Sequence, residues 1–436
     1  MMLDINHSPG QLEMLQNEKA YRRAIHRDRV RYNQHMVTLR ESIAAGDAKT
    51  AALAQDWLLT SPSSKRTAIA QLLIAGKDID VWTYQDVKAL ADTVTLFEPI
   101  AEPVTVFAKE KTSKRGFRAI FSFGDRHRVG QRMLANLIES HTFKRSYQHF
   151  DDGVPKAIKR VLAQIDAGQV WLAHLDIKDF FPSFTIEGLT DFLPLPQTVV
   201  EAALTGRNMM LECASSPQGL SPQHLIEEAR RGLPQGAASS PAISHLCVSQ
   251  LALDVAILEH LINYEDDFLI LAKSKAELGS RIGALTDAVG NLPGGQFELS
   301  VKTVAHASEG LDFLGHRLFS RNGQARAEPS VGNTMRLAKR LHETDEKHAV
   351  FSNLSGKIEK SALLHSCADK FAVISGWKAA FASCHPETEG WQYLLAIEEG
   401  VHADLKAHGL CPSDLPAAAE PLKRQNRKFY YYKWFA

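Results

Sequence analysis

Two adjacent carboxylates lie between two apolar runs near the middle of the chain. Residues 258–262 precede Tyr264-Glu265-Asp266-Asp267, and residues 268–272 follow it. Short apolar runs that meet at a tight polar turn predict a β-hairpin. Adjacent carboxylates repel each other unless a cation neutralises them. Mg²⁺ binds carboxylate and phosphate oxygens together, so the hairpin is a candidate metal site, although four residues alone also fit a solvated acidic turn.

A third carboxylate ends another apolar run. Residues 170–176 read as a buried strand with Asp176 at its carboxyl end. Pro182 cannot continue a central strand, so we expect the chain to turn there, with Phe181 close to Asp176. Downstream, residues 232–236 form a flexible Gly-Leu-Pro-Gln-Gly loop. Ser239-Ser240-Pro241 then opens an apolar helix that we expect to run to about residue 262.

Two short strands are predicted after the acidic hairpin and a helix at about 275–290. Residues 299–303 place Lys302 at the end of a strand, and residues 311–318 form a compact strand and turn that contains Leu314 and Gly315. A further hairpin is predicted upstream, where residues 104–109 and 118–123 flank a basic turn. Lysine and arginine at such a tip would bind polyphosphate, and a charged surface hairpin is the alternative.

The two ends of the chain are predicted to be largely helical. Residues 11–44 form a long helix rich in arginine, which fits either a phosphate backbone or a solvated helix face. Helices are expected at about 331–348, 355–384 and 388–407, followed by a linker at 409–421. The final residues mix basic and aromatic side chains, which suits single-strand binding or a hydrophobic plug.

Composition limits the class of protein. The 436 residues have a formal net charge of zero and 44% hydrophobic residues, which argues against global disorder and gives no overall basic character. Five dispersed cysteines indicate reduced thiols in a cytoplasmic protein. We find neither a signal-peptide pattern nor an apolar run of about 18 residues, so no membrane is expected.

The ordered series of these segments resembles the fingers and palm of a reverse transcriptase. The series runs from the carboxylate strand through the Pro-Gln-Gly loop, the Tyr-x-Asp-Asp hairpin and the Lys-Thr strand to the Phe-Leu-Gly turn, across roughly residues 104–320. The resemblance implies an α+β right-hand polymerase fold whose palm is an RRM-like antiparallel sheet with helices. It implies a helical N-terminal extension at 1–98, fingers and palm at 99–320, a helical thumb at 321–408, and a linker and tail at 409–436.

The resemblance also implies two-metal nucleotidyl transfer with two Mg²⁺ ions, Mn²⁺ being the alternative. The residues at the family's metal positions are Asp176, the backbone carbonyl of Ile177, Asp266 and Asp267. Lys302 stands where the family has a lysine close to the leaving phosphates, which makes it a candidate general acid.

Further residues match the family's nucleotide-binding positions. Arg118, with Lys109 as its partner, would hold the triphosphate of a dNTP. Phe181 stands at the steric gate, whose ring would exclude a 2′-hydroxyl. Gln235 and Gly236 would lie against the incoming nucleotide and the template base.

Two more features complete the resemblance. The turn Leu314-Gly315 resembles the primer grip. The hairpin departs from the family at Glu265, because the family more often has Ala, Met, Val or Cys there. This third carboxylate leaves fidelity and metal preference open.

The type of reverse transcriptase is inferred from what the chain lacks. The remaining length does not fit integrase, RNase H or protease regions, and neither HNH-type Cys/His pairs nor the Val-Thr-Gly signature of retrons is present. The chain resembles bacterial defence-associated enzymes of the unknown groups and abortive-infection relatives. This implies cDNA synthesis from a non-coding RNA template in antiphage defence, with a homo-oligomer or a second defence protein as further partners.

Three other functions are also compatible with the sequence. They are a group II intron- or retron-type reverse transcriptase, a non-catalytic RNA-binding scaffold, and an RNA-dependent RNA polymerase. The priming hydroxyl has two candidate sources. They are the RNA's own hydroxyl and a tail tyrosine (Tyr430, Tyr431 or Tyr432). Packing of these tyrosines is the simpler role.

Overall fold

The computed structural model describes residues 9–76, 82–111, 116–215, 220–352, 360–407 and 409–411. The structure is mixed α/β and divides into two compact units. The first unit comprises residues 1–144, 178–251 and 290–297, and the second comprises 145–177, 252–289 and 298–436. The chain therefore passes several times between the units, and each is described by itself.

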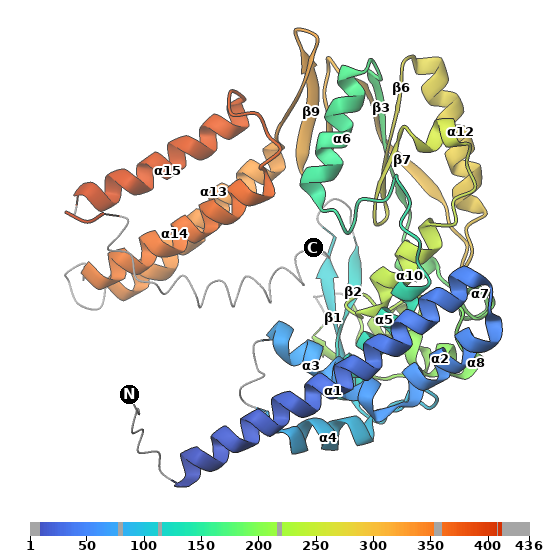
Figure 1. Cartoon of the computed structure of the whole chain (residues 1–436). Helices are drawn as coiled ribbons and strands as arrows, with labels where there is room; N and C mark the ends of the chain where they lie inside the picture. The colour runs from blue at the N-terminus through green and yellow to red at the C-terminus, as the bar shows by residue number, and fades with distance from the viewer. Residues whose placement is uncertain are drawn as a thin grey trace, which may run out of the picture. The chain divides into compact units, whose positions relative to one another are not determined.

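The first unit begins with helices α1 (Pro9–Ala45), α2 (Ala48–Thr60), α3 (Pro62–Gly76) and α4 (Tyr84–Thr93). Asp47 caps α2 by accepting a hydrogen bond from the Thr50 amide, and Thr83 and Asp86 form a capping box at α4. Figure 1 shows α1 as the longest of these helices. This confirms the prediction that the amino-terminal region is helical.

A three-stranded sheet in the order β2-β1-β4 forms the other part of the first unit. Strand β1 (Pro103–Glu110) pairs antiparallel with β2 (Phe117–Ser122) and parallel with β4 (Met210–Ser215). Its core contains Val104, Val106 and Phe121. The remaining elements of this unit are α5 (Asp125–Ser140), the 3₁₀ turn η1 (Phe181–Ser183), α7 (Ile186–Phe192), α8 (Gln197–Val199), η2 (Val200–Leu204), η3 (Gly206–Asn208), α9 (Pro222–Ala229) and α10 (Ser239–Val248).

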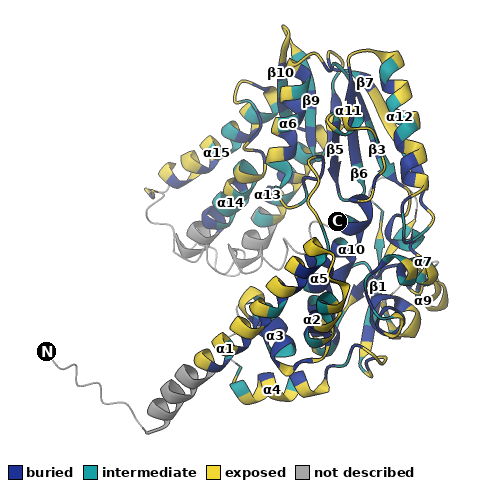
Figure 2. Ribbon diagram, turned by 45° about the vertical axis from the view of Figure 1, so that its right-hand side comes forward, coloured by how far each residue is buried: buried dark blue, intermediate teal, exposed yellow. Residues whose placement is uncertain are grey.

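The second unit is built on a four-stranded antiparallel sheet in the order β5-β6-β3-β7. Its strands are β3 (Trp171–Ile177), β5 (Leu261–Tyr264), β6 (Asp267–Ala272) and β7 (Leu299–His306). The hairpin β5–β6 confirms the predicted turn at residues 264–267. Figure 2 shows β3, β5 and β6 as mostly buried.

One face of this sheet packs against helix α6 (Val154–Asp166) and a second sheet. That sheet has the order β10-β9-β8, with β8 (Leu311–Phe313), β9 (His316–Arg321) and β10 (Gln324–Pro329). Leu172, Leu269 and Leu271 from the four-stranded sheet join Ile158 and Phe313 in this core. The apolar face fixes the strand register, because a one-residue slip would turn these side chains outward.

Helices complete the second unit. They are α11 (Val255–Leu258), α12 (Lys275–Gly290), α13 (Val331–Ser352), α14 (Lys360–Ala380) and α15 (Glu389–Ala407). Helices α13 to α15 share a hydrophobic cluster that includes Leu337, Ile374 and Leu394. Among the helices that the structure describes, none is long and apolar enough to cross a membrane.

Two sequence predictions about local structure are wrong. The helix that begins at Ser239 ends at Val248, and residues 261–264 form β5 instead. A continuous apolar run cannot distinguish a buried helix from a buried strand, and here pairing with β6 decides the outcome. Lys302 does not end its strand, because β7 continues to His306.

Candidate active site

The three aspartates lie at one end of the four-stranded sheet. Asp176 on β3 and Asp267 on β6 are direct cross-strand partners. On the same face, the preceding pairs are His174 with Leu269 and Leu172 with Leu271. Side chains alternate along a strand, so this face changes from an apolar core to an acidic edge within three residue pairs.

The turn between β5 and β6 holds Glu265 and Asp266. Glu265 has a positive φ of 55°, an uncommon conformation for a residue with a side chain. The Asn263 side-chain amide donates to the backbone oxygens of Glu265 (2.8 Å) and Asp267 (3.3 Å). The Ile177 amide donates to the Asp266 oxygen at 3.1 Å. These bonds place the backbones of Ile177 and Asp266 side by side.

Lys302 binds two of the aspartates. Its Nζ lies 3.0 Å from Asp176 Oδ2 and 3.0 Å from Asp267 Oδ1. In the β3–β7 pairing, His174 faces Thr303 and Leu175 faces Val301, so Lys302 is the extra residue of a bulge. Bulges re-aim side chains next to active sites, and this one explains how a lysine within a strand reaches the carboxylates.

His174 is a site residue that the sequence analysis missed. Its Nε2 lies 2.8 Å from Asp267 Oδ1. A signal was present, because His174 precedes Asp176 by two positions and must share its face of the strand. Its ring also packs against Phe313 in a T-shaped arrangement, with ring centroids 5.3 Å apart. His174 thereby connects the acidic edge with the β8–β9 turn.

The local charges shift the pKa values of three groups. Burial alone would raise the pKa of Asp267, but the His174 hydrogen bond and the charge of Lys302 hold it below its ordinary value. Burial opposes the charge on Lys302, yet the carboxylates of Asp267 and Asp176 raise its pKa. Burial, together with the charges of Asp266 and Asp267, raises the pKa of Glu265 to about 8.

The acidic edge has the chemistry of a divalent-cation site. Asp176 Oδ1 is buried and has no hydrogen-bond partner, which is unfavourable for a carboxylate unless a cation binds it. Within the described part of the chain, no three His, Cys, Asp or Glu side chains form a preformed metal cluster. The Lys302 ammonium contacts both Asp176 and Asp267, so one cation can bind the two carboxylates together. The residues present therefore fit a hard cation.

The predicted primer grip lies in the same unit. Leu314 and Gly315 both have positive φ, 46° and 79°, in the turn between β8 and β9. The Gly315 oxygen accepts hydrogen bonds from the Asn333 side chain at 2.7 Å and the Ser330 amide at 2.9 Å. The turn is thus fixed to the start of α13.

The predicted nucleotide-binding residues lie in the first unit. Lys109 on β1 faces Arg118 on β2. Burial and the charge of Arg118 lower the pKa of Lys109. Like charges directly opposite each other destabilise a sheet, so this pair favours an anionic ligand. Lys111 at the end of the same hairpin binds Asp179 at 2.9 Å.

The Pro-Gln-Gly loop forms backbone hydrogen bonds with both Phe181 and strand β2. The Leu233 amide donates to the Phe181 oxygen at 2.9 Å, and the Phe121 amide donates to the Gln235 oxygen at 2.9 Å. A side chain at Gly236, where φ is 111°, would overlap the Phe121 oxygen. Gln235, Gly236 and Phe181 are therefore held together. The tail residues Tyr430, Tyr431 and Tyr432 lie outside the described residues.

We expect Gly232→Ala to destabilise the protein strongly. Gly232 has a φ of 60°, and a Cβ there would overlap the Phe181 oxygen and the Pro182 backbone. The expected loss of unfolding free energy is roughly 2 kcal/mol or more, measured by chemical denaturation. Gly46→Ala is the matched control, because Gly46 has a φ of 72° with no atom within 4 Å of an added Cβ. Equal losses for both variants would show that the Phe181 contact does not matter.

The chain was compared with protein families, curated proteins and solved structures. Residues 108–318 match the model of the family described as reverse transcriptase (RNA-dependent DNA polymerase). The match spans every predicted site residue except the tail tyrosines. This part of the chain is thus similar to the reverse transcriptase family.

A solved structure also shows similarity. It is telomerase from Candida albicans in complex with a TWJ fragment of telomeric RNA, with 13% sequence identity and a TM-score of 0.30. The alignment covers 73% of this chain, which spans 62% of the length of that one. No match was found among curated proteins.

Proposed function

We propose that the chain is an RNA-directed DNA polymerase that adds dNTPs to a primer on an RNA template. The observation that carries the proposal is the acidic edge, where Asp176 and Asp267 are cross-strand partners and Asp176 Oδ1 is buried without a partner. The match of residues 108–318 to the family supports it independently.

The residues that would hold two divalent ions are Asp176, Asp266 and Asp267, together with the backbone carbonyl of Ile177. Mg²⁺ is the ion we expect, because its ligands are carboxylate and phosphate oxygens, and Mn²⁺ is the alternative. Bound ions of this kind activate the primer hydroxyl and neutralise the leaving pyrophosphate. His174 and Lys302 keep Asp267 ionised and oriented.

Lys302 would hold a proton near the leaving group. The two carboxylates raise its pKa, so its Nζ is protonated at neutral pH. A protonated amine beside the reacting phosphates can donate to the pyrophosphate oxygen as it leaves. We therefore propose Lys302 as the general acid.

The defining experiment is primer extension. The purified chain should extend a DNA primer on an RNA template when Mg²⁺ and dNTPs are present. Product should disappear when EDTA removes the divalent ion, and Mg²⁺ should restore it. If the chain gives no product on any annealed primer–template with either Mg²⁺ or Mn²⁺, the polymerase proposal is wrong.

We expect Arg118→Ala and Lys109→Ala to weaken dNTP binding. Each cation would contact the triphosphate, so KM for dNTP should rise about tenfold with a smaller change in kcat. Steady-state kinetics at saturating primer–template measures this. Arg128→Ala is the control, because Arg128 is an exposed residue that pairs with Asp125 on α5. A tenfold KM change in the control as well would make the effect nonspecific.

The domain organisation follows from the same proposal. We assign residues 1–98 to a helical extension, 99–320 to fingers and palm, 321–408 to a thumb, and 409–436 to a linker and tail. The antiparallel sheet with the aspartates supports the palm, and the shared core of α13 to α15 supports the thumb. Strand β10 pairs with β9, so the sheet of β8, β9 and β10 extends beyond the proposed palm boundary at residue 320 to Pro329.

The cellular role we propose is antiphage defence in the bacterial cytoplasm. The template would be a structured non-coding RNA and the product a cDNA. A homo-oligomer or a second defence protein would be further partners. Sequencing the nucleic acids that copurify with the chain before and after phage infection tests this role, and recovery of unrelated cellular RNA alone would contradict it.

A further inference from the structure

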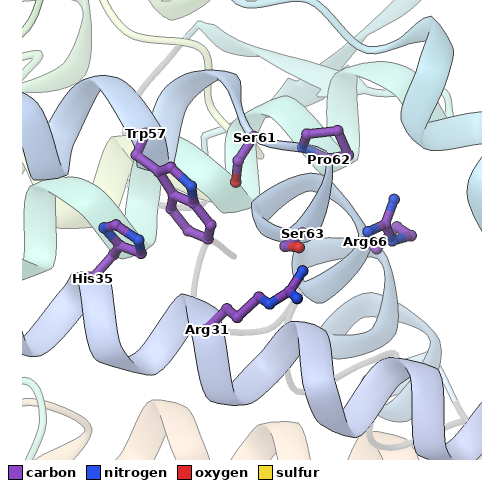
Figure 3. A pocket seen from close by; sticks show the side chains of 7 residues that line it. All are labelled: Arg31, His35, Trp57, Ser61, Pro62, Ser63 and Arg66. Carbon is purple, nitrogen blue, oxygen red and sulfur yellow. The ribbon is translucent and has the colours of Figure 1, made fainter.

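A cavity of about 500 Å³ lies among the amino-terminal helices, outside the reverse transcriptase match. Its lining includes Arg31 and His35 of α1, Trp57 of α2, and Ser61, Ser63 and Arg66 around the start of α3. In Figure 3 the Ser61 hydroxyl points into the space between the Trp57 ring and Ser63, and the Arg31 side chain borders this space on the side of α1. The cavity therefore combines aromatic, cationic and hydroxyl groups.

The positive charge of the cavity comes from Arg31. The buried carboxylate of Asp28 binds Arg66 through two hydrogen bonds of 2.7 and 2.9 Å, and Ser63 at 2.7 Å. The Asp28 carboxylate thus neutralises the positive charge of Arg66. Arg31 is exposed, and within the described part of the chain it has neither a hydrogen bond nor an ion pair. An unpaired guanidinium at a cavity is suited to bind a phosphate through two parallel hydrogen bonds.

The aromatic part of the cavity is a flat stack. The ring centroids of His35 and Trp57 are 3.8 Å apart, and the two ring planes form an angle of 11°. Burial lowers the pKa of His35, so its ring is neutral at pH 7. Beside the stack, Ser61 Oγ accepts a hydrogen bond from the Ser64 amide at 3.1 Å, which leaves its proton to donate to a ligand. A flat apolar surface with a nearby donor suits a nucleobase.

We propose that this cavity binds one nucleotide of a single-stranded RNA, with its phosphate on Arg31 and its base against the His35–Trp57 stack. Helix α1 supports an RNA strand as the source. Arg23 and Arg27 are also exposed and precede Arg31 at intervals of four residues, so the three arginines lie along one face of the helix. A series of cations along one helix follows a phosphate backbone. The site does not depend on the polymerase reaction, because none of its residues lies within residues 108–318.

Calorimetric titration with three probes tests the site. The probes are adenosine monophosphate, a single-stranded tetra-adenylate RNA and inorganic phosphate. The full chain carries Asp266→Ala and Asp267→Ala without divalent ions, so polymerase activity has no bearing on the result. We expect Arg31→Gln and Trp57→Ala each to weaken tetra-adenylate binding about tenfold. Trp57→Phe should retain most of the affinity, because it keeps an aromatic ring.

Arg29→Gln is the matched control, because Arg29 is exposed on the same helix and does not line the cavity. Equal weakening by Arg29→Gln and Arg31→Gln, or no effect of Trp57→Ala, would overturn the site. If adenosine monophosphate binds as tightly as the tetra-adenylate, the ligand of the site is a free nucleotide and not an RNA strand. Phosphate binding as tight as either would exclude base stacking.

Discussion

Replacing both Asp266 and Asp267 with alanine abolishes primer extension, with an expected loss of at least about 10³-fold in kcat. The double variant removes the carboxylates of the hairpin and leaves Asp176 with Lys302 as its ion-pair partner. Folding should survive, because the β5–β6 pairing and the Asn263 hydrogen bonds use backbone atoms of the turn. Primer extension and a melting curve measure the two effects separately.

Two controls make this result specific. Asp266→Asn with Asp267→Asn keeps the shape of both side chains but removes their charge, so it should be nearly as inactive. Asp312→Ala removes a carboxylate that is 59% exposed on β8, where it pairs with Arg317, and should keep full activity. If the double alanine variant extends primers at the normal rate, the acidic edge is not the metal site. If it is inactive yet complements the protein's role in cells, the scaffold alternative is correct.

The parts of the site that follow local sequence rules could be predicted. The hairpin at residues 264–267 required only two apolar runs and a polar turn, and the turn at Leu314 and Gly315 required only a break between short strands. Strand β4 was not predicted. It pairs with β1 across about a hundred residues, and no periodicity within a short window carries that information.

The contacts of Lys302 and His174 depend on how strands pair. A bulge in β7 turns Lys302 toward the aspartates, and a bulge is not visible in a pattern of alternating side chains. His174 lies on the correct face by simple alternation, but its partner Asp267 comes from the antiparallel neighbour. The cavity at Arg31 and Trp57 was even less predictable from the sequence, because residues of three separate helices line it.

Phe181 is the residue on which the choice between deoxyribonucleotides and ribonucleotides should depend. Its side chain is largely buried, and its carbonyl is fixed by the Leu233 amide. Gly232 contacts the same carbonyl so closely that no side chain fits between them. The Pro-Gln-Gly loop therefore restricts how far Phe181 can move. A rigid ring excludes a 2′-hydroxyl by steric repulsion, which a mobile one would not.

We expect Phe181→Ala to lower discrimination against ribonucleotides by about 10²-fold, measured as the ratio of kcat/KM for dNTP and NTP. The truncation also removes buried ring contacts and should destabilise the protein by roughly 3 kcal/mol. Phe184→Ala separates the two effects, because Phe184 is buried in the same aromatic cluster through Phe180 and Phe297. This control should lose stability and keep its preference for dNTP. Phe181→Tyr, which keeps the ring, should discriminate like the unaltered chain. If the unaltered chain itself uses NTP and dNTP equally well, Phe181 is not a gate and the RNA polymerase alternative gains support.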